Sequence, residues 1–102
     1  MQEIKEVFGK IQILESGKEF GSSILIIEPG KEIKEHYHRK TKEVEVVLEG
    51  HVHCGDRIQK AGDINVWETE EYHGYKNESK AVVKILCITF PPYDPKDVFE
   101  ED

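Results

Sequence analysis

The sequence has few cysteines and prolines and no long apolar run: its 102 residues include 2 cysteines and 4 prolines. No apolar segment approaches the roughly 20 residues that a membrane-spanning helix needs. The charged amino end, M-Q-E-I-K-E-V-F, lacks the apolar core of a signal peptide. Cys54 and Cys87 are not spaced as a zinc-binding pair. These absences predict a cytoplasmic protein with free thiols and no membrane segment.

An excess of positive charge is also missing. The 21 acidic residues outnumber the 14 lysines and arginines, which gives a net charge of −7. Since a nucleic-acid binder needs a basic face, this balance argues against DNA or RNA as a partner, and it disfavours acidic membrane surfaces in the same way. Charged residues make up 34% of the chain, mostly Glu and Lys, a composition that is also typical of thermophile proteins.

Short apolar runs between turn signals predict an all-β chain with no room for a long helix. The turn signals are glycine paired with proline, aspartate or a small residue, as in Pro29-Gly30, Gly55-Asp56 and Gly62-Asp63. The expected strands are residues 10–14, 23–28, 33–38, 43–48, 51–54, 57–60, 64–67, 72–76 and 81–90.

Two imidazoles and a carboxylate have a spacing that suits one metal ion. His36 and His38 are two residues apart, so on a strand they point to the same face. Glu43 follows a short polar turn and returns on the next strand, and His73 offers a third imidazole further along the chain. Three imidazoles and one carboxylate suit divalent Mn, Fe, Co, Ni, Cu or Zn. The sequence therefore predicts a transition-metal site.

The same residues carry a resemblance to the cupin family. Gly30, His36, His38, Glu43 and Gly50 fall at every fixed position of the first cupin motif. The second motif is matched less completely: it keeps Gly62, His73 and Asn77, but Glu68 stands in place of its proline and Glu70 in place of its second glycine.

This resemblance implies a small single-domain cupin, whose fold is a double-stranded β-helix, or jelly-roll barrel. It also implies that His36, His38, Glu43 and His73 are the metal ligands. We take residues 1–102 as one domain, with the barrel core at about 10–90 and a C-terminal strap and acidic tail at 91–102, where three prolines end the sheet. The other interpretation of this tail is a disordered acidic end.

Three further side chains are expected inside the barrel. By strand alternation, Glu45 shares a face with Glu43. A buried carboxylate must be hydrogen-bonded, paired with a cation or kept protonated, so Glu45 is a candidate acid/base group. Trp67 and Tyr75 are candidates for the wall of a substrate pocket, because each combines contact area with a hydrogen-bonding tip.

Two other clusters have simpler interpretations. The segment His51-Val52-His53-Cys54 also places two histidines two residues apart, but nothing nearby completes a ligand set, so we take these as ordinary strand residues. Glu68, Glu70 and Glu71 crowd three acids beside His73. They are either solvated turn residues or an acidic rim that repels anions.

These features favour a metalloenzyme that acts on a small polar metabolite, by isomerase-like or epimerase-like chemistry or by dioxygenase-like chemistry. A divalent ion and one carboxylate leave a net charge near +1, which suits a hydroxy-acid, diol or enolate oxygen pair. The alternative is a non-catalytic barrel that binds a sugar or an organic acid. The expected outer face of the strand at 43–48 is apolar (Val44, Val46, Leu48), so a homodimer through sheet packing is also predicted.

Overall fold

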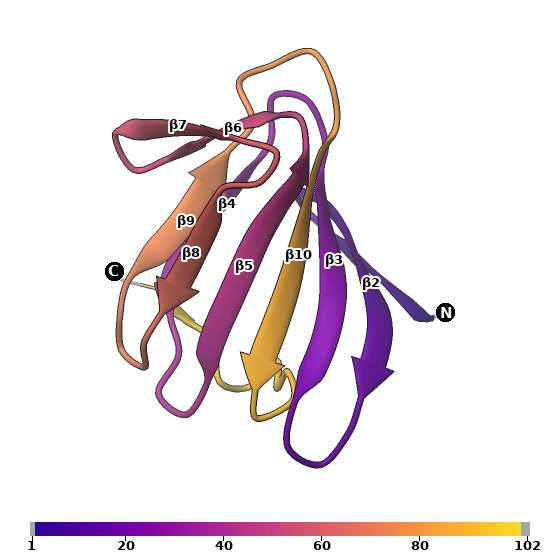
Figure 1. Ribbon diagram of the computed structural model, residues 1–102, viewed down its shortest axis with the longest axis vertical. Coiled ribbons are helices and arrows are strands. Elements are labelled where there is room, and N and C mark those ends of the chain that lie inside the picture. Colours follow the sequence, from indigo (N-terminus) through magenta and orange to yellow (C-terminus); the bar gives the residue numbers. More distant parts are fainter. Residues whose placement is uncertain (1, 101–102) are drawn as a thin grey trace.

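The computed structural model describes residues 2–100, which form two antiparallel β-sheets facing each other (Figure 1). The first sheet has 6 strands in the order β1-β2-β3-β10-β5-β8, and the second has 5 in the order β11-β4-β9-β6-β7. The strand bounds are β1 Gln2–Glu6, β2 Gly9–Ser16, β3 Gly21–Ile27, β4 Glu32–Tyr37, β5 Lys42–Glu49, β6 His51–Cys54, β7 Arg57–Lys60, β8 Ile64–Trp67, β9 His73–Lys76, β10 Val83–Phe90 and β11 Phe99–Glu100.

The expected all-β double-sheet fold is confirmed. Strands β2 to β10 lie where alternation and turn signals predicted strands, with ends that differ by a few residues. Residues 2–100 contain no helix that could cross a lipid bilayer. Both cysteines are free, as the sequence predicted, and both are buried.

Two strands were not predicted from the sequence. Strand β1 reads Q-E-I-K-E and has one apolar residue, Ile4, so alternation gave no signal. It forms because all five residues pair with β2 and because Ile4 packs on the core. Strand β11 has two residues, Phe99 and Glu100, which pair with Tyr37 and His36. Only the long-range contact with β4 makes this segment a strand.

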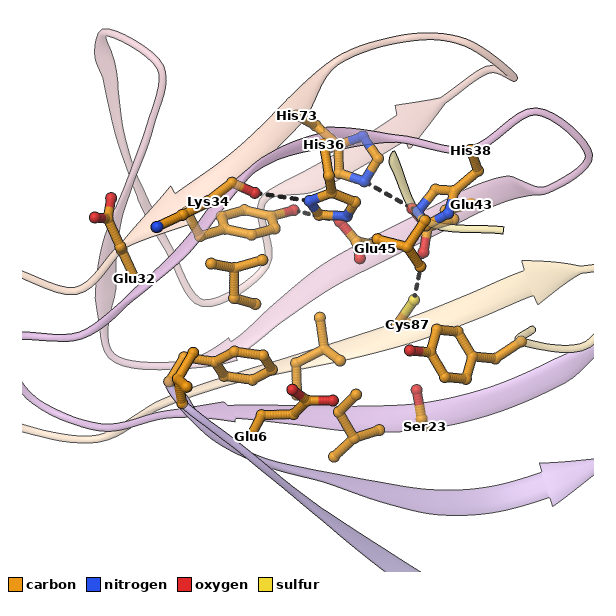
Figure 2. Close-up of a pocket in the computed structure, with 18 of the residues that line it drawn as sticks. Glu6, Ser23, Glu32, Lys34, His36, His38, Glu43, Glu45, His73 and Cys87 are labelled. Atoms are coloured by element: carbon orange, nitrogen blue, oxygen red, sulfur yellow. Dashed lines mark hydrogen bonds and ion pairs between the residues drawn. The ribbon is translucent and has the colours of Figure 1, made fainter. Parts of the chain in front are cut away.

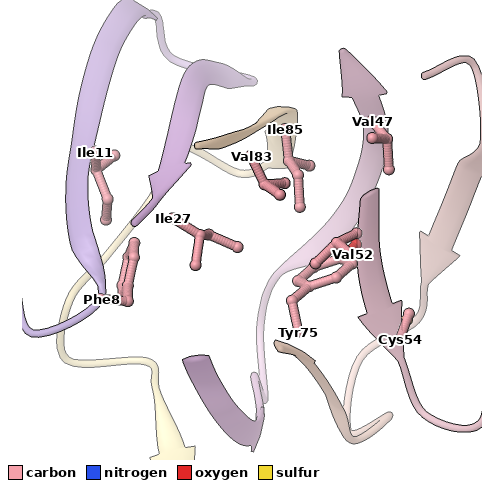
Figure 3. Close-up of a cluster of buried hydrophobic side chains, with 9 residues drawn as sticks. All are labelled: Phe8, Ile11, Ile27, Val47, Val52, Cys54, Tyr75, Val83 and Ile85. Atoms are coloured by element: carbon pink, nitrogen blue, oxygen red, sulfur yellow. The ribbon is translucent and has the colours of Figure 1, made fainter. Parts of the chain in front are cut away.

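The core lies between the two sheets, where alternate residues of each strand point inward (Figure 3). Ile27, Val83 and Ile85 from the first sheet are fully buried, as is Val52 from the second. Cross-strand register places Ile11, Leu25, Ile85 and Val47 in one row across the first sheet. This apolar row belongs to the core, in which Ile11, Val47 and Ile85 are buried and Leu25 is half-buried.

Along β5 and β10, the inner face changes from apolar to polar. One step beyond the apolar row, Cys87 lies between Ser23 and Glu45, and one step further Thr89 lies opposite Glu43. The C-terminal segment returns to β4 at Phe99 and Glu100, while Glu101 and Asp102 of the expected tail lie outside the described residues. His36, His38 and His73 gather at this polar end of the barrel.

Candidate metal centre

The fold brings together the four side chains that the sequence predicted as metal ligands. His36 is on β4, His38 follows that strand directly, Glu43 is on β5 of the opposite sheet, and His73 begins β9. His36 and His73 are cross-strand partners, and each of the four residues offers one ligand atom within 4.8 Å of the others. Figure 2 shows the four side chains converging at one end of a cavity.

Backbone carbonyls hold the three imidazole rings. The Nδ1 atom of His36 lies 2.8 Å from the carbonyl oxygen of Lys34, that of His38 lies 2.6 Å from the carbonyl of Asp97, and that of His73 lies 3.0 Å from the carbonyl of Glu71. A carbonyl oxygen only accepts, so Nδ1 carries the hydrogen in each ring and donates it. In a neutral ring, Nε2 is therefore left with a free lone pair.

These lone pairs face a carboxylate. Oε1 of Glu43 lies 2.7 Å from Nε2 of His73 and 3.1 Å from Nε2 of His38, and none of the three atoms has a hydrogen-bond partner. His38, Glu43 and His73 are each about 5% exposed or less, so water does not compensate. Buried acceptors that face one another repel unless a proton or a cation lies between them. The donor set therefore fits a divalent transition metal.

Proton binding shows the same conflict. Burial lowers the pKa values of His38 and His73, but the adjacent Glu43 carboxylate favours the protonated rings more strongly, so both pKa values are raised. For His36, burial prevails and the pKa is lowered. Burial raises the pKa of Glu43, yet His38 and His73 outweigh it and the pKa is lowered well below its usual range. Protons thus compete with a metal for the same lone pairs.

Glu45 lies beside the ligands and is buried. Its Oε1 accepts hydrogen bonds from Trp67 Nε1 and Tyr75 Oη, each at 2.7 Å. Burial, followed by the negative charge of Glu43, raises the pKa of Glu45. Of the three outcomes expected for this buried carboxylate, the structure shows hydrogen bonding. Asn65 continues the network by donating to Tyr75 Oη at 3.0 Å.

The two aromatic residues predicted for the pocket wall have different positions. Tyr75 is 3% exposed and lines the cavity. Trp67 stacks on the His73 ring, with centroids 4.9 Å apart and planes 7° apart, and is not among the described residues that line the cavity. Trp67 thus packs against the face of the His73 ring, outside the cavity lining, and donates its indole N–H to Glu45.

Three residues of the site carried no sequence signal. Asp97 is 59 positions from His38, yet its carboxylate accepts hydrogen bonds from the backbone of Arg39 and Lys40 and from Thr41. The Cys87 thiol donates to Glu43 Oε2 at 3.3 Å. A Cβ on Gly74 would lie 2.7 Å from the carbonyl oxygen of Ile33, so only glycine lets β9 approach β4 this closely beside His73.

The other clusters stay apart from this centre. His51 and His53 lie on β6, and within residues 2–100 they join no group of ligand-forming side chains. Glu68, Glu70 and Glu71 are exposed turn residues between β8 and β9. Glu71 accepts a hydrogen bond from the Glu68 amide, and Glu68 forms an ion pair with Lys42 at 3.5 Å. None of these acids lines the cavity among the described residues.

Fold and site define a class of protein: a small two-sheet β-barrel with a candidate metal centre of three histidines and one glutamate at its polar end. Residues 23–89 match the family model of the cupin domain. The chain therefore belongs to the cupin family. No curated protein matches it in sequence.

Solved structures share the fold. An uncharacterized conserved protein with a double-stranded β-helix domain from Klebsiella pneumoniae has a TM-score of 0.72 at 20% identity, over 88% of this chain and 73% of its own. A cupin-superfamily sugar phosphate isomerase from Silicibacter pomeroyi has a TM-score of 0.65 at 24% identity, over 71% of this chain and 50% of its own. Oxalate decarboxylase from Bacillus subtilis has a TM-score of 0.79 at 22% identity, over 92% of this chain and 28% of its own. This chain thus spans half of the isomerase chain and under a third of the decarboxylase chain.

Replacing Asp97 by alanine should weaken metal binding without removing a ligand. The loop between His38 and Glu43 then loses three hydrogen bonds, and the carbonyl that orients His38 is no longer held. Loss of such an outer partner typically costs about 10- to 100-fold in metal affinity. Titration of Zn²⁺ against a competing chelator measures this, with exposed Asp94→Ala as the matched control. Equal affinities for the two variants would contradict the assigned role of Asp97.

Proposed function

We propose that this protein is a metal-dependent enzyme that acts on a small metabolite through a pair of oxygen atoms. The observation that carries the proposal is the convergence of buried, unpartnered Nε2 atoms on Glu43 Oε1. His36, His38, Glu43 and His73 would hold the ion. When bound, a divalent transition metal supplies Lewis-acid polarisation of a carbonyl or enolate oxygen. With one carboxylate ligand, the centre keeps a net charge near +1, which favours an anionic oxygen pair.

Glu45 supports proton-transfer chemistry at this centre. It lines the same cavity as the ligands, and hydrogen bonds from Trp67 and Tyr75 fix the position of its carboxyl group. A positioned carboxyl with a raised pKa is suited to take a proton from a substrate carbon or return it. We therefore favour isomerase-like or epimerase-like chemistry over dioxygenase-like chemistry. Two of the similar structures carry the names of an isomerase and a decarboxylase.

A non-catalytic binding barrel is the second candidate. The observation in its favour is that Glu45 Oε1 already receives two hydrogen bonds, so this carboxyl has a structural task without any reaction. The same cavity and centre would then bind a small sugar or organic acid and release it unchanged.

The metal content of the purified protein tests the centre. We expect about one equivalent of a transition metal, which His73→Ala should lose because the variant removes one of the converging lone pairs. His53→Ala on β6 is the matched control and should retain the metal, since His53 lies outside the ligand group. Elemental analysis of the three proteins measures this and also identifies the metal. Wild-type protein that cannot be loaded with any of the six metals would remove the basis of the proposal.

Replacing Glu45 by glutamine tests catalysis. We expect metal-loaded wild-type protein to exchange the hydrogen on the oxygen-bearing carbon of simple α-hydroxyketones in D₂O, measured by NMR. Glu45→Gln should slow this exchange by about 100-fold or more while the metal content stays unchanged. Exposed Glu49→Gln on the same strand should have no effect. Unaltered exchange in Glu45→Gln would favour a structural role, and consumption of oxygen with any substrate would favour dioxygenase chemistry.

We also propose a homodimer through the outer face of the first sheet. Register aligns Ile24, Leu86, Val46 and Ile64 in one row across four strands of this face. A second row places Ile88 and Val44 beside Val66. Ile64 is 62% exposed and Val66 49%. A second copy of the chain would cover such a continuous apolar surface.

Charges placed on this face should produce a monomer. Ile64→Lys together with Val66→Lys puts two cations into the proposed interface, whereas Ile58→Lys changes an apolar residue of the other sheet that is 64% exposed. Sedimentation equilibrium at micromolar concentration should find dimers of the wild type and of Ile58→Lys, and monomers of the double variant. A monomeric wild type would count against the dimer.

A further inference from the structure

We infer that the molecule bound at this centre joins an oxygen-bearing head to an apolar body. The position of the head rests on the proposed function, whereas the body follows from the cavity wall alone. The cavity holds about 650 Å³ and extends well beyond the four candidate ligands. This narrows the small polar metabolite expected from the sequence to a molecule that is polar at one end only.

The polarity of the wall changes in layers along the first sheet. Glu43 and Thr89 pair in the layer of the ligands, and in the next layer Cys87 lies between Ser23 and Glu45. One layer further, Ile11 pairs with Leu25, and both line the cavity. A bound molecule that reaches past the second layer therefore meets hydrocarbon.

The opposite sheet changes at the same level. His36 and His73 pair in the ligand layer, and the next inward pair is Ile33 with Tyr75. The Tyr75 hydroxyl is already engaged by Glu45 and Asn65, so the face that it offers to the cavity is its ring. Both walls thus become apolar within two layers of the candidate ligands, which is the arrangement that a head-and-tail molecule fits.

The turn between β1 and β2 adds a further apolar contact. Phe8 is buried and lines the cavity, and its neighbour Val7 lines the same cavity while remaining 88% exposed. An apolar side chain this exposed contributes almost no hydrophobic free energy to folding. Contact with the apolar body of a bound molecule would bury it, together with the half-buried Val98 of the C-terminal segment.

The charged lining residues argue against a phosphorylated ligand. Phosphate is usually held by arginine, lysine or a helix N-terminus. The described residues that line the cavity include no arginine, and residues 2–100 contain no helix. The two lining lysines, Lys31 and Lys34, are exposed, and the same region carries three exposed glutamates. Figure 2 shows the ammonium end of Lys34 directed away from the histidine cluster, although its backbone carbonyl is bonded to His36, and Glu32 lies farther away.

Alkyl hydroxamates of increasing length test the inference, because they share one bidentate oxygen head. Calorimetry with Zn²⁺-loaded protein should show octanohydroxamate binding about 100-fold tighter than acetohydroxamate, the ratio expected when roughly half of the six added methylenes are buried. Leu25→Gln should reduce this ratio at least tenfold, mainly by weakening octanohydroxamate binding. Exposed Ile58→Gln is the matched control, and Ile33→Gln on the opposite wall replaces Leu25→Gln if that variant fails to fold.

The outcomes separate this inference from the proposed function. The ratio of the two hydroxamate affinities measures contact with the apolar cavity wall, so it should persist in metal-free protein. The loss of affinity on removing Zn²⁺ measures binding at the metal centre. Zn²⁺-dependent binding with equal affinities for both chain lengths would overturn the inference and leave the metal centre standing. A persistent ratio without dependence on Zn²⁺ supports the inference and contradicts the proposed function. Tighter binding of glucose 6-phosphate than of octanohydroxamate would also overturn the inference.

Discussion

The candidate centre depends on one arrangement: three imidazole rings donate their Nδ1–H groups to backbone carbonyls. These hydrogen bonds fix the orientation of each ring and therefore the direction of its Nε2 lone pair. Two of these lone pairs meet the Glu43 carboxylate in a buried site, where acceptors alone repel one another. A cation between these atoms would remove the repulsion, and so would a proton, since the adjacent Glu43 carboxylate raises the pKa values of His38 and His73. The cavity and the Glu45 carboxyl group both lie beside this centre, and the family resemblance in the sequence rests on its residues.

A fold can contain such a cluster only if other regions supply its stability. Here the barrel divides along its strands: one end holds fully buried Ile27, Val83 and Ile85, and the other holds the polar layers. The C-terminal segment supplies hydrogen-bond acceptors at the polar end. The Asp97 carboxylate accepts three hydrogen bonds from the loop between His38 and Glu43. Burial of polar groups costs free energy unless they are paired, and almost every polar group around the centre except the converging atoms is paired.

The layers also connect structure to specificity. Cupin barrels are shared by proteins of different activities, such as the isomerase and the decarboxylase with this fold, so architecture alone does not identify a substrate. In this chain, alternation along β3, β4 and β10 decides which side chains line the cavity. The step from a polar to an apolar lining residue takes two residues on β3, from Ser23 to Leu25, and three on β4, from His36 to Ile33. Under the proposed function, discrimination among ligands would depend on positions up to two layers away from the candidate metal ligands.

The sequence by itself determined the strands β2 to β10, the all-β class and the four candidate ligands, because alternation and motif spacing are local properties of the chain. It also placed Glu45 and Tyr75 inside by parity. Tertiary structure alone decided the rest. Strand β1 has a polar sequence and exists through pairing, Asp97 reaches His38 across 59 positions, and Trp67 came to lie behind His73 although its parity was correct. These outcomes depend on which segments meet in space, and a contact between distant segments leaves no periodic trace in either of them.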